Sequence, residues 1–246
     1  MIGDIWAVMW KEWKELLQGD GRGRLGLLAF LGVFGVFMPL QVGRDWAASP
    51  LVPVAAVWVS LFLVTTVVSD SFAGERERQT LETLLASRLP DRAILFGKVG
   101  TAVAYGWGLT VLGLLLSLVT TNVAYRAGRP LLFPAAIGLG AVVLSFLGAG
   151  LAAGAGVLIS LRAASVRQAQ QTMSFTLMAL IFGIGFGGQA LPDAWKVRLA
   201  QTLAGMDASL ALLVSAGALV LLDFGLLAAA MHRFRRARRS GGQMVG

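Results

Sequence analysis

The chain has no cysteine and a single histidine among its 246 residues. Without cysteine it has no disulfide framework and no thiol-based metal or redox site. One histidine with no cysteine beside it does not supply the ligand set of a zinc site. We therefore expect no metal to be bound.

Sequence motifs of common enzymes are also missing. Gly97-Lys98 resembles the end of a phosphate-binding loop, but Val99 follows it and Arg92 stands where the first glycine belongs. G-x-S-x-G, H-E-x-x-H and C-x-x-C are absent as well. We expect no catalytic residue, no ATPase activity and no cofactor on this chain.

Charge is scarce and apolar residues dominate. Only 14% of residues are charged, whereas 57% are hydrophobic and the mean hydropathy is +0.74, well above the roughly 45–50% apolar content of soluble domains. The net charge of +8 does not indicate nucleic-acid binding, because the basic residues alternate with apolar runs and form no soluble basic face. The composition predicts an all-α integral membrane protein in a lipid membrane.

Six apolar segments predict six transmembrane helices, each near or above the ~20 residues that cross a bilayer. They lie at about 25–41, 51–69, 98–121, 133–160, 172–190 and 209–231. Nothing between them is long or polar enough for a soluble domain, so residues 1–246 form a single membrane domain. Segment 72–92 is the most charged loop between spans, and 233–246 is a basic tail.

The distribution of lysine and arginine between the loops predicts the orientation of the chain in the membrane. Of the 21 such residues, 16 fall on the side of the two termini, the 72–92 loop and the loop of Arg162 and Arg167. The other 5 are Arg44, Arg126, Arg129, Lys196 and Arg198. The positive-inside rule therefore places both termini and the charged loop in the cytoplasm.

The N-terminal segment 1–18 has the pattern of a helix that lies on the membrane. Trp6, Trp10 and Trp13 share one helical stripe with aliphatic residues, and charged residues fill the other face. Tryptophan suits the headgroup region. Residues 191–207 are also amphipathic, and they read either as a short helix on the outer side or as a plain connecting loop.

The densest charge lies between Ser71 and Lys98, in the stretch S-F-A-G-E-R-E-R-Q-T-L-E-T-L-L-A-S-R-L-P-D-R-A-I-L-F-G-K. The residues of this stretch that we expect to contact another protein are Glu75, Arg76, Glu77, Arg78, Leu81, Glu82 and Leu85. The leucines at i, i+3 and i+4 predict an amphipathic helix over 75–86 that is offered to another protein.

This stretch resembles the first cytoplasmic loop of ABC-2-type (type V) ABC transporter permeases, which reads roughly A-G-E-R-E-R-G-T-L-E-x-L-L and is followed by G-K at the next span. Residues 73–85 reproduce that run with Gln79 in place of the usual glycine. The run departs from the family at residues 87–92, where the proline has moved.

The resemblance implies a permease subunit of an ATP-driven transporter, in the inner (plasma) membrane of a bacterium or archaeon. Segment 1–18 would be its elbow helix, and the 72–92 loop would couple to a separate ATP-binding subunit that binds ATP and magnesium. A second permease subunit would complete a homodimer or heterodimer. Arg162 and Arg167 would make a second, smaller ATPase contact, or would be topology signals only.

In that family the second and fifth spans approach the transport pathway. The candidate lining residues are Thr65, Thr66, Phe175, Thr176 and Met178. The apolar spans favour export of an amphiphilic or hydrophobic cargo. Two other functions stay open: a membrane scaffold that recruits an ATPase without transport, and an ion-coupled carrier that uses Asp223.

Asp223 is the one acidic residue deep inside an apolar run. An intramembrane carboxylate marks a functional or paired position. It either bonds to a neighbouring helix through groups such as Thr101, Tyr105 or Thr110, which we favour, or lies in a proton or cation path. Two glycine-rich runs, at 148–156 and 183–188, predict close helix packing, with bending in the fifth span as the alternative.

Overall fold

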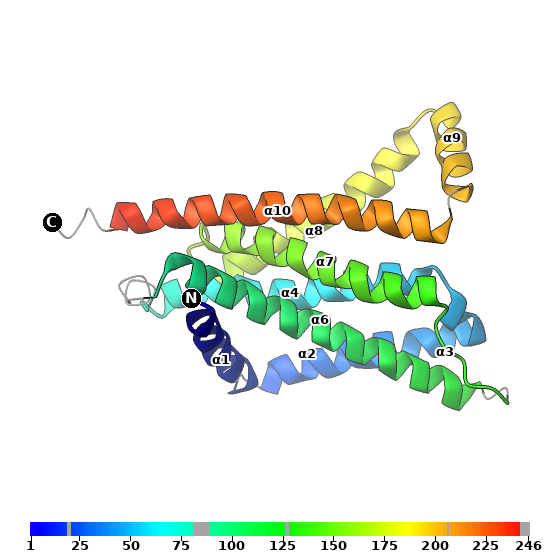
Figure 1. The fold of residues 1–246 in the computed structure, drawn as a ribbon, viewed down its shortest axis with the longest axis horizontal. Coiled ribbons are helices and arrows are strands. Elements are labelled where there is room, and N and C mark those ends of the chain that lie inside the picture. Colours follow the sequence, from blue (N-terminus) through cyan, green and yellow to red (C-terminus); the bar gives the residue numbers. More distant parts are fainter. Residues whose placement is uncertain (19–20, 81–88, 126–127, 206, 242–246) are drawn as a thin grey trace.

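The computed structural model describes residues 1–18, 21–80, 89–125, 128–205 and 207–241. Every regular element in these ranges is helical, and the helices form an elongated bundle (Figure 1). The elements are α1 (Ile2–Gln18), α2 (Gly21–Gly32), η1 (Val33–Phe37), α3 (Met38–Val42), η2 (Gly43–Ala48), α4 (Leu51–Glu77), α6 (Asp91–Ala124), α7 (Ala135–Ser160), α8 (Val166–Ala190), α9 (Asp193–Ala204) and α10 (Ala208–Gly241).

Six helical stretches among the described residues are long and apolar enough to cross a membrane, which confirms the predicted fold class. They are Gly26–Ala48, Leu51–Glu77, Asp91–Ala124, Ala135–Ser160, Val166–Ala190 and Ser209–Arg233. Two shorter helices accompany them: α1 at the N-terminus and α9 between α8 and α10. The helical reading of residues 191–207 is thus confirmed over Asp193–Ala204.

Several helices extend beyond their apolar runs. α4 continues through the charged residues to Glu77, and α6 begins at Asp91, seven residues before its predicted start. α10 continues to Gly241, so most of the basic tail is helical. The predicted amphipathic helix over 75–86 is wrong in its first part, because residues 75–77 form the last turn of α4 and a turn follows at Arg78 and Gln79.

The first span contains a π-helical turn that a proline explains. Pro39 has no N–H, so it cannot bond the carbonyl of Gly35 four residues earlier, as an α-helix requires. The hydroxyl of Thr120 in α6 donates to that carbonyl at 2.8 Å instead. A β-carbon on Gly35 would lie 2.7 Å from a methyl carbon of Leu116. The irregular turn therefore allows this span to approach α6 closely.

The core lies where α4, α6 and α7 meet, with α10 packed against α7. Its fully buried members include Val64 and Phe72 of α4, Ile94 and Leu95 of α6, and Val157 of α7. Glycines permit the close contacts of α7: β-carbons on Gly148, Gly150, Gly154 and Gly156 would meet Val57, Asp223, Leu226 and Val68 at 3.1 Å or less. The packing interpretation of this glycine run is confirmed.

α8 and α9 protrude from the bundle, and α8 rises away from α10 toward α9 (Figure 1). The exposed apolar side chains of α8 include Phe175, Met178, Phe182 and Phe186. β-carbons on Gly183, Gly187 and Gly188 would meet nothing within 4 Å. The prediction that the fifth-span glycines pack closely against other helices is therefore not met within a single chain at these three positions.

Candidate functional site

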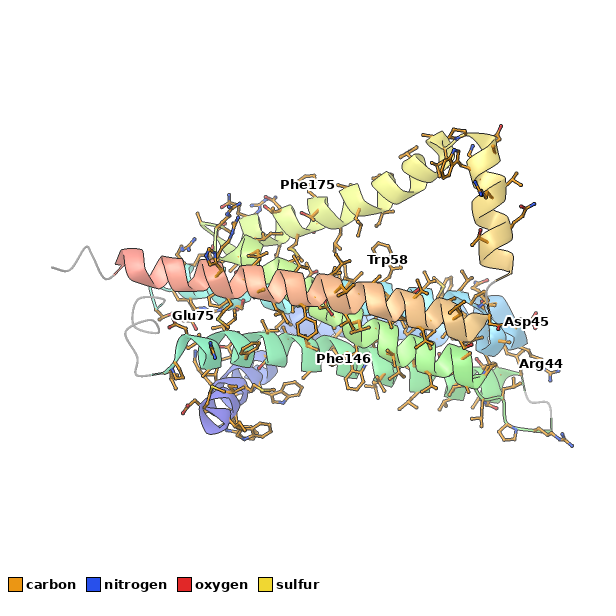
Figure 2. All side chains as sticks on the ribbon, turned by 45° about the horizontal axis from the view of Figure 1, so that its top comes forward. Arg44, Asp45, Trp58, Glu75, Phe146 and Phe175 are labelled. Atoms are coloured by element: carbon orange, nitrogen blue, oxygen red, sulfur yellow. The ribbon has the colours of Figure 1, made fainter. Side chains whose placement is uncertain are left out.

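The charged motif lies at the end of the bundle where α4 ends and α6 begins. Figure 2 shows Glu75 at this end and Arg44 and Asp45 at the opposite end. The N-terminus and the C-terminal end of α10 lie at the same end as Glu75 (Figure 1). This is the end at which the sequence places the cytoplasm.

Glu75 is turned into the protein. It is only 5% exposed, and its Oε1 lies 3.3 Å from the Nζ of Lys98, which is 3% exposed. The other carboxylate oxygen, Oε2, accepts a hydrogen bond from the hydroxyl of Thr80. A buried charge is costly unless it is paired and hydrogen-bonded, and both conditions are met here. The two ends of the α4–α6 connection are thereby held together.

α1 completes this charge cluster. Glu12 accepts from Lys98 at 2.7 Å, and Lys11 reaches Glu75 at 3.1 Å and Glu15 at 3.3 Å. Burial lowers the pKa of Lys11, but its hydrogen bond with Glu75 and the charges of Glu75, Glu12 and Glu15 outweigh that effect and raise it. We call Lys11, Glu12, Glu75 and Lys98 the ionic cluster. It ties α1, α4 and α6 together.

α1 also packs directly on α6. A β-carbon on Gly97 would lie 2.5 Å from a methyl carbon of Val8, so only a glycine permits this approach. Trp13 meets Tyr105 edge to face at 6.4 Å between ring centres. The predicted helix over residues 1–18 is confirmed, with Trp6 and Trp10 exposed. The face that carries Glu12 contacts the bundle.

Arg76 and Glu77 connect α4 to the α7–α8 turn. The guanidinium of Arg76 donates to the carbonyl of Ala163 and, at 2.9 Å, to that of Leu161, so it binds the end of α7. A carboxylate oxygen of Glu77 accepts from the backbone N–H of Val166 at the start of α8 at 3.2 Å. The side chains that look like a docking surface in the sequence therefore join α4 to two further helices.

Ser160 of α7 makes further hydrogen bonds to α4 near the end of that helix. Its hydroxyl accepts from the backbone N–H groups of Phe72 and Ala73 at 3.2 and 3.0 Å, and donates to the carbonyl of Ser69 at 3.2 Å. α4 and α7 are thus hydrogen-bonded through one buried serine.

Gln79 ends α4 in a left-handed conformation with φ of 56°. A glycine would adopt this conformation without steric cost. Arg78, beside it, is exposed and pairs with Asp70 at 3.1 Å. Of the remaining predicted motif residues, Leu81, Glu82 and Leu85 lie outside the described residues.

The predicted pathway residues of the second and fifth spans lie on α4 and α8. Thr65 is buried and donates to the carbonyl of Leu61 in its own helix. Thr66 and Thr176 are exposed and also bond to carbonyls of their own helices. Phe175 and Met178 are exposed on α8 (Figure 2 shows Phe175 on its outer side).

Asp223 faces α7. A β-carbon on Gly150 would lie 2.8 Å from its Oδ2, and its buried Oδ1 has no hydrogen-bond partner among the described residues. Thr101 and Thr110, two expected partners, donate to carbonyls of their own helix instead, at 2.9 and 2.8 Å. The ring of Tyr105 contacts Trp13 of α1.

The exposed arginines Arg162 and Arg167 flank the turn between α7 and α8. Three members of the ionic cluster, Lys11, Glu12 and Lys98, were not among the predicted site residues. The sequence could have identified Lys98 as a site residue, because it belongs to the Gly97-Lys98 pair of the motif. Lys11 and Glu12 had none, since they lie more than 60 positions away from Glu75.

Comparison with known proteins identifies the family. A search of curated proteins finds no significant match. A sequence profile for ABC-2 type transporters matches residues 3–197, from α1 into α9. The match includes the whole ionic cluster, the charged end of α4 and five of the six candidate spans. The chain therefore belongs to the ABC-2 type transporter family, as a multi-pass membrane permease domain.

Proposed function

We propose that the chain is the permease subunit of an ATP-driven exporter of amphiphilic or hydrophobic cargo in a bacterial or archaeal inner membrane. Permease domains of this family in general lack ATPase activity, bind no cofactor and work with an ATP-binding subunit. Both termini and the ionic cluster would face the cytoplasm, where a separate ATPase binds ATP and magnesium.

The observation that best supports this proposal is the way four helices meet the end of α4. Glu75 binds Lys98 of α6 and Lys11 of α1, Arg76 binds the end of α7, and Glu77 binds the start of α8. A push on the turn that follows α4 would therefore move several spans together instead of bending one loop. Coupled motion of packed elements is what alternation between inward-open and outward-open states requires.

The motif then has two roles along its length. Glu75, Arg76 and Glu77 would transmit motion inside the permease. Arg78 and the residues up to Leu85, including Leu81 and Glu82, would dock on the ATPase. The turn of Arg162 and Arg167 would add a second ATPase contact or would only fix the topology.

A flux measurement tests the proposal directly. The permease and its ATPase are reconstituted in vesicles, and the uptake of a lipophilic dye such as rhodamine 6G is followed with and without ATP. We expect uptake only with ATP and a hydrolysis-competent ATPase. A complex that forms and hydrolyses ATP without dye movement would indicate a scaffold. Uptake driven by a proton gradient alone, and lost in Asp223→Asn, would indicate a secondary carrier.

The transmission role has its own test. Arg76→Gln removes both bonds to the end of α7, so we expect the ATPase to bind normally while the dye moved per ATP hydrolysed falls severalfold. Arg44→Gln, an exposed arginine at the opposite end, is the matched control and should leave that ratio unchanged. An unchanged ratio in Arg76→Gln would reject the transmission role.

A further inference from the structure

An open cavity of about 430 Å³ lies beside the α7–α8 turn, at the same end of the bundle as the ionic cluster. Its walls come from α7, the turn, the first two turns of α8, and α10. The lining residues are Leu158, Ile159, Arg162, Ala163, Gln168, Thr172 and Arg233. Its volume falls within the range of small-molecule sites.

The charged side chains that line this cavity are all positively charged. Arg162 and Arg233 both line it, and neither guanidinium group has a hydrogen bond or ion pair among the described residues. No carboxylate is among the lining residues. The carbonyls of Leu161 and Ala163, which would repel an anion, already accept hydrogen bonds from Arg76. Two unpaired guanidinium groups are the arrangement that binds phosphate-like anions well.

The position of the cavity at the membrane boundary is the second observation. Arg233 is the last residue of the sixth candidate span, and Arg162 follows the end of the fourth by two residues. Leu158 and Ile159 belong to the fourth span itself, so they form an apolar wall at membrane depth. In Figure 2, α8 and α10 separate from this end of the bundle toward α9.

We propose that this cavity binds the anionic headgroup of a membrane amphiphile, with the phosphate between Arg162 and Arg233 and the acyl chains along Leu158 and Ile159. A soluble anion would leave the apolar wall unused, and an acidic peptide would have to enter the depth of the fourth span. Binding requires only the folded chain in a bilayer. It can therefore be measured apart from transport and from the ATPase.

The absence of cysteine allows a reporter at one defined position. Thr172 lines the cavity, and its hydroxyl bonds, among the residues that the structure describes, only to the carbonyl of Gln168 in its own helix. The full chain with Thr172→Cys, labelled with the small fluorophore bimane, is placed in phosphatidylcholine nanodiscs. Nitroxide-labelled phosphatidic acid or phosphatidylcholine, with the nitroxide at the same acyl position, is added at equal mole fractions. Quenching then reports occupancy.

We expect phosphatidic acid to quench more strongly than phosphatidylcholine. This preference should fall about fivefold in Arg162→Gln and about fivefold in Arg233→Gln, the loss expected for one basic contact at a membrane surface. Arg167→Gln removes the same charge nearby without lining the cavity, and should keep the preference. Both cavity arginines are exposed, so these variants should fold, and melting curves from tryptophan fluorescence check this.

Four results would overturn the proposal. Phosphatidic acid and phosphatidylcholine could quench bimane equally in the labelled Thr172→Cys chain without a further substitution. Arg167→Gln could reduce the preference as much as the cavity variants do, which would indicate general surface charge. Inorganic phosphate at millimolar concentration could change the bimane signal with the same arginine dependence while labelled lipid does not, which would assign the cavity to a free anion. If only the ATPase subunit shields the reporter, the cavity is part of that contact instead.

Discussion

At the scale of single residues, glycines set how closely α7 approaches its neighbours. A β-carbon on Gly156 would lie only 2.0 Å from a methyl carbon of Val68 in α4. Gly156→Ala should therefore lower the free energy of unfolding by about 1–3 kcal/mol, the usual cost of overpacking. A β-carbon on Gly225 of α10 would meet nothing within 4 Å, so Gly225→Ala is the matched control. Tryptophan fluorescence during heating measures both, and a Gly156→Ala protein that melts with the parent would contradict the close approach.

Asp223 is a second residue whose surroundings lead to a prediction. Its Oδ1 is buried without a hydrogen-bond partner among the residues that the structure describes, and an unpaired carboxylate at membrane depth costs free energy. Asp223→Asn keeps the shape of the side chain against Gly150 and removes the charge, so the melting temperature should stay equal or rise. A clear fall would show that the carboxylate has a stabilising partner. Loss of transport in a stable Asn variant would assign Asp223 to a proton or cation path and overturn the structural role favoured from the sequence.

At the scale of helices, the ionic cluster holds α1, α4 and α6 in register. Glu75→Gln leaves the buried Lys98 with one carboxylate partner, Glu12, instead of two. Breaking a buried ion pair from one side costs about 3 kcal/mol or more. We expect a drop in melting temperature, and a smaller drop when Lys98→Met is added, because the second change removes the excess positive charge that Glu75→Gln leaves in the ionic cluster. Arg78→Gln breaks only an exposed pair, and should cost under about 1 kcal/mol. Additive losses in the double variant would show that Glu75 and Lys98 do not interact.

The helices themselves could be predicted from the sequence, because a long apolar run and its lysine and arginine flanks are local signals. The charged motif could be recognised for the same reason. The groups that its side chains bind could not be predicted, since Glu75 is paired with Lys11, 64 positions away, and Arg76 with a carbonyl 85 positions away. A local pattern shows that a helix is charged, and only the packed structure shows which helices its charges bind.

Helix ends were predicted poorly for a related physical reason. Hydropathy marks where the membrane ends, whereas a helix continues as long as its backbone bonds are made. α4 therefore runs to Glu77, where the left-handed Gln79 stops it, and α10 runs on through the basic segment to Gly241. The π-helical turn at Val33–Phe37 follows from Pro39 together with Thr120 of another helix, so the proline alone did not reveal it.

At the scale of the whole molecule, the chain presents two different outer faces. α8 exposes large apolar side chains such as Phe182 and Phe186, and β-carbons on its glycines Gly183, Gly187 and Gly188 would meet nothing within 4 Å. Helix faces that combine apolar residues with unpacked glycines allow close approach of another helix. α10 also shows large apolar side chains, such as Leu221 and Phe224, but its other side packs on α7. We therefore expect α8, with Thr66 of α4, to face a second permease subunit, and α10 to face lipid.

Cysteine crosslinking distinguishes the two faces, because the native chain has no cysteine. Phe175, 70% exposed on α8, and Leu221, 75% exposed on α10, are equally accessible positions in a single chain. In membranes treated with copper phenanthroline, Phe175→Cys should form a covalent dimer if two copies meet along α8, while Leu221→Cys should remain monomeric. The reverse pattern would place the α10 face at the subunit contact, and with it the unpaired Asp223. Crosslinking of neither variant, with intact ATP-driven dye uptake by the same membranes, would exclude α8 as a contact between identical subunits. Phe175 and Met178 would then lose their place beside a shared pathway.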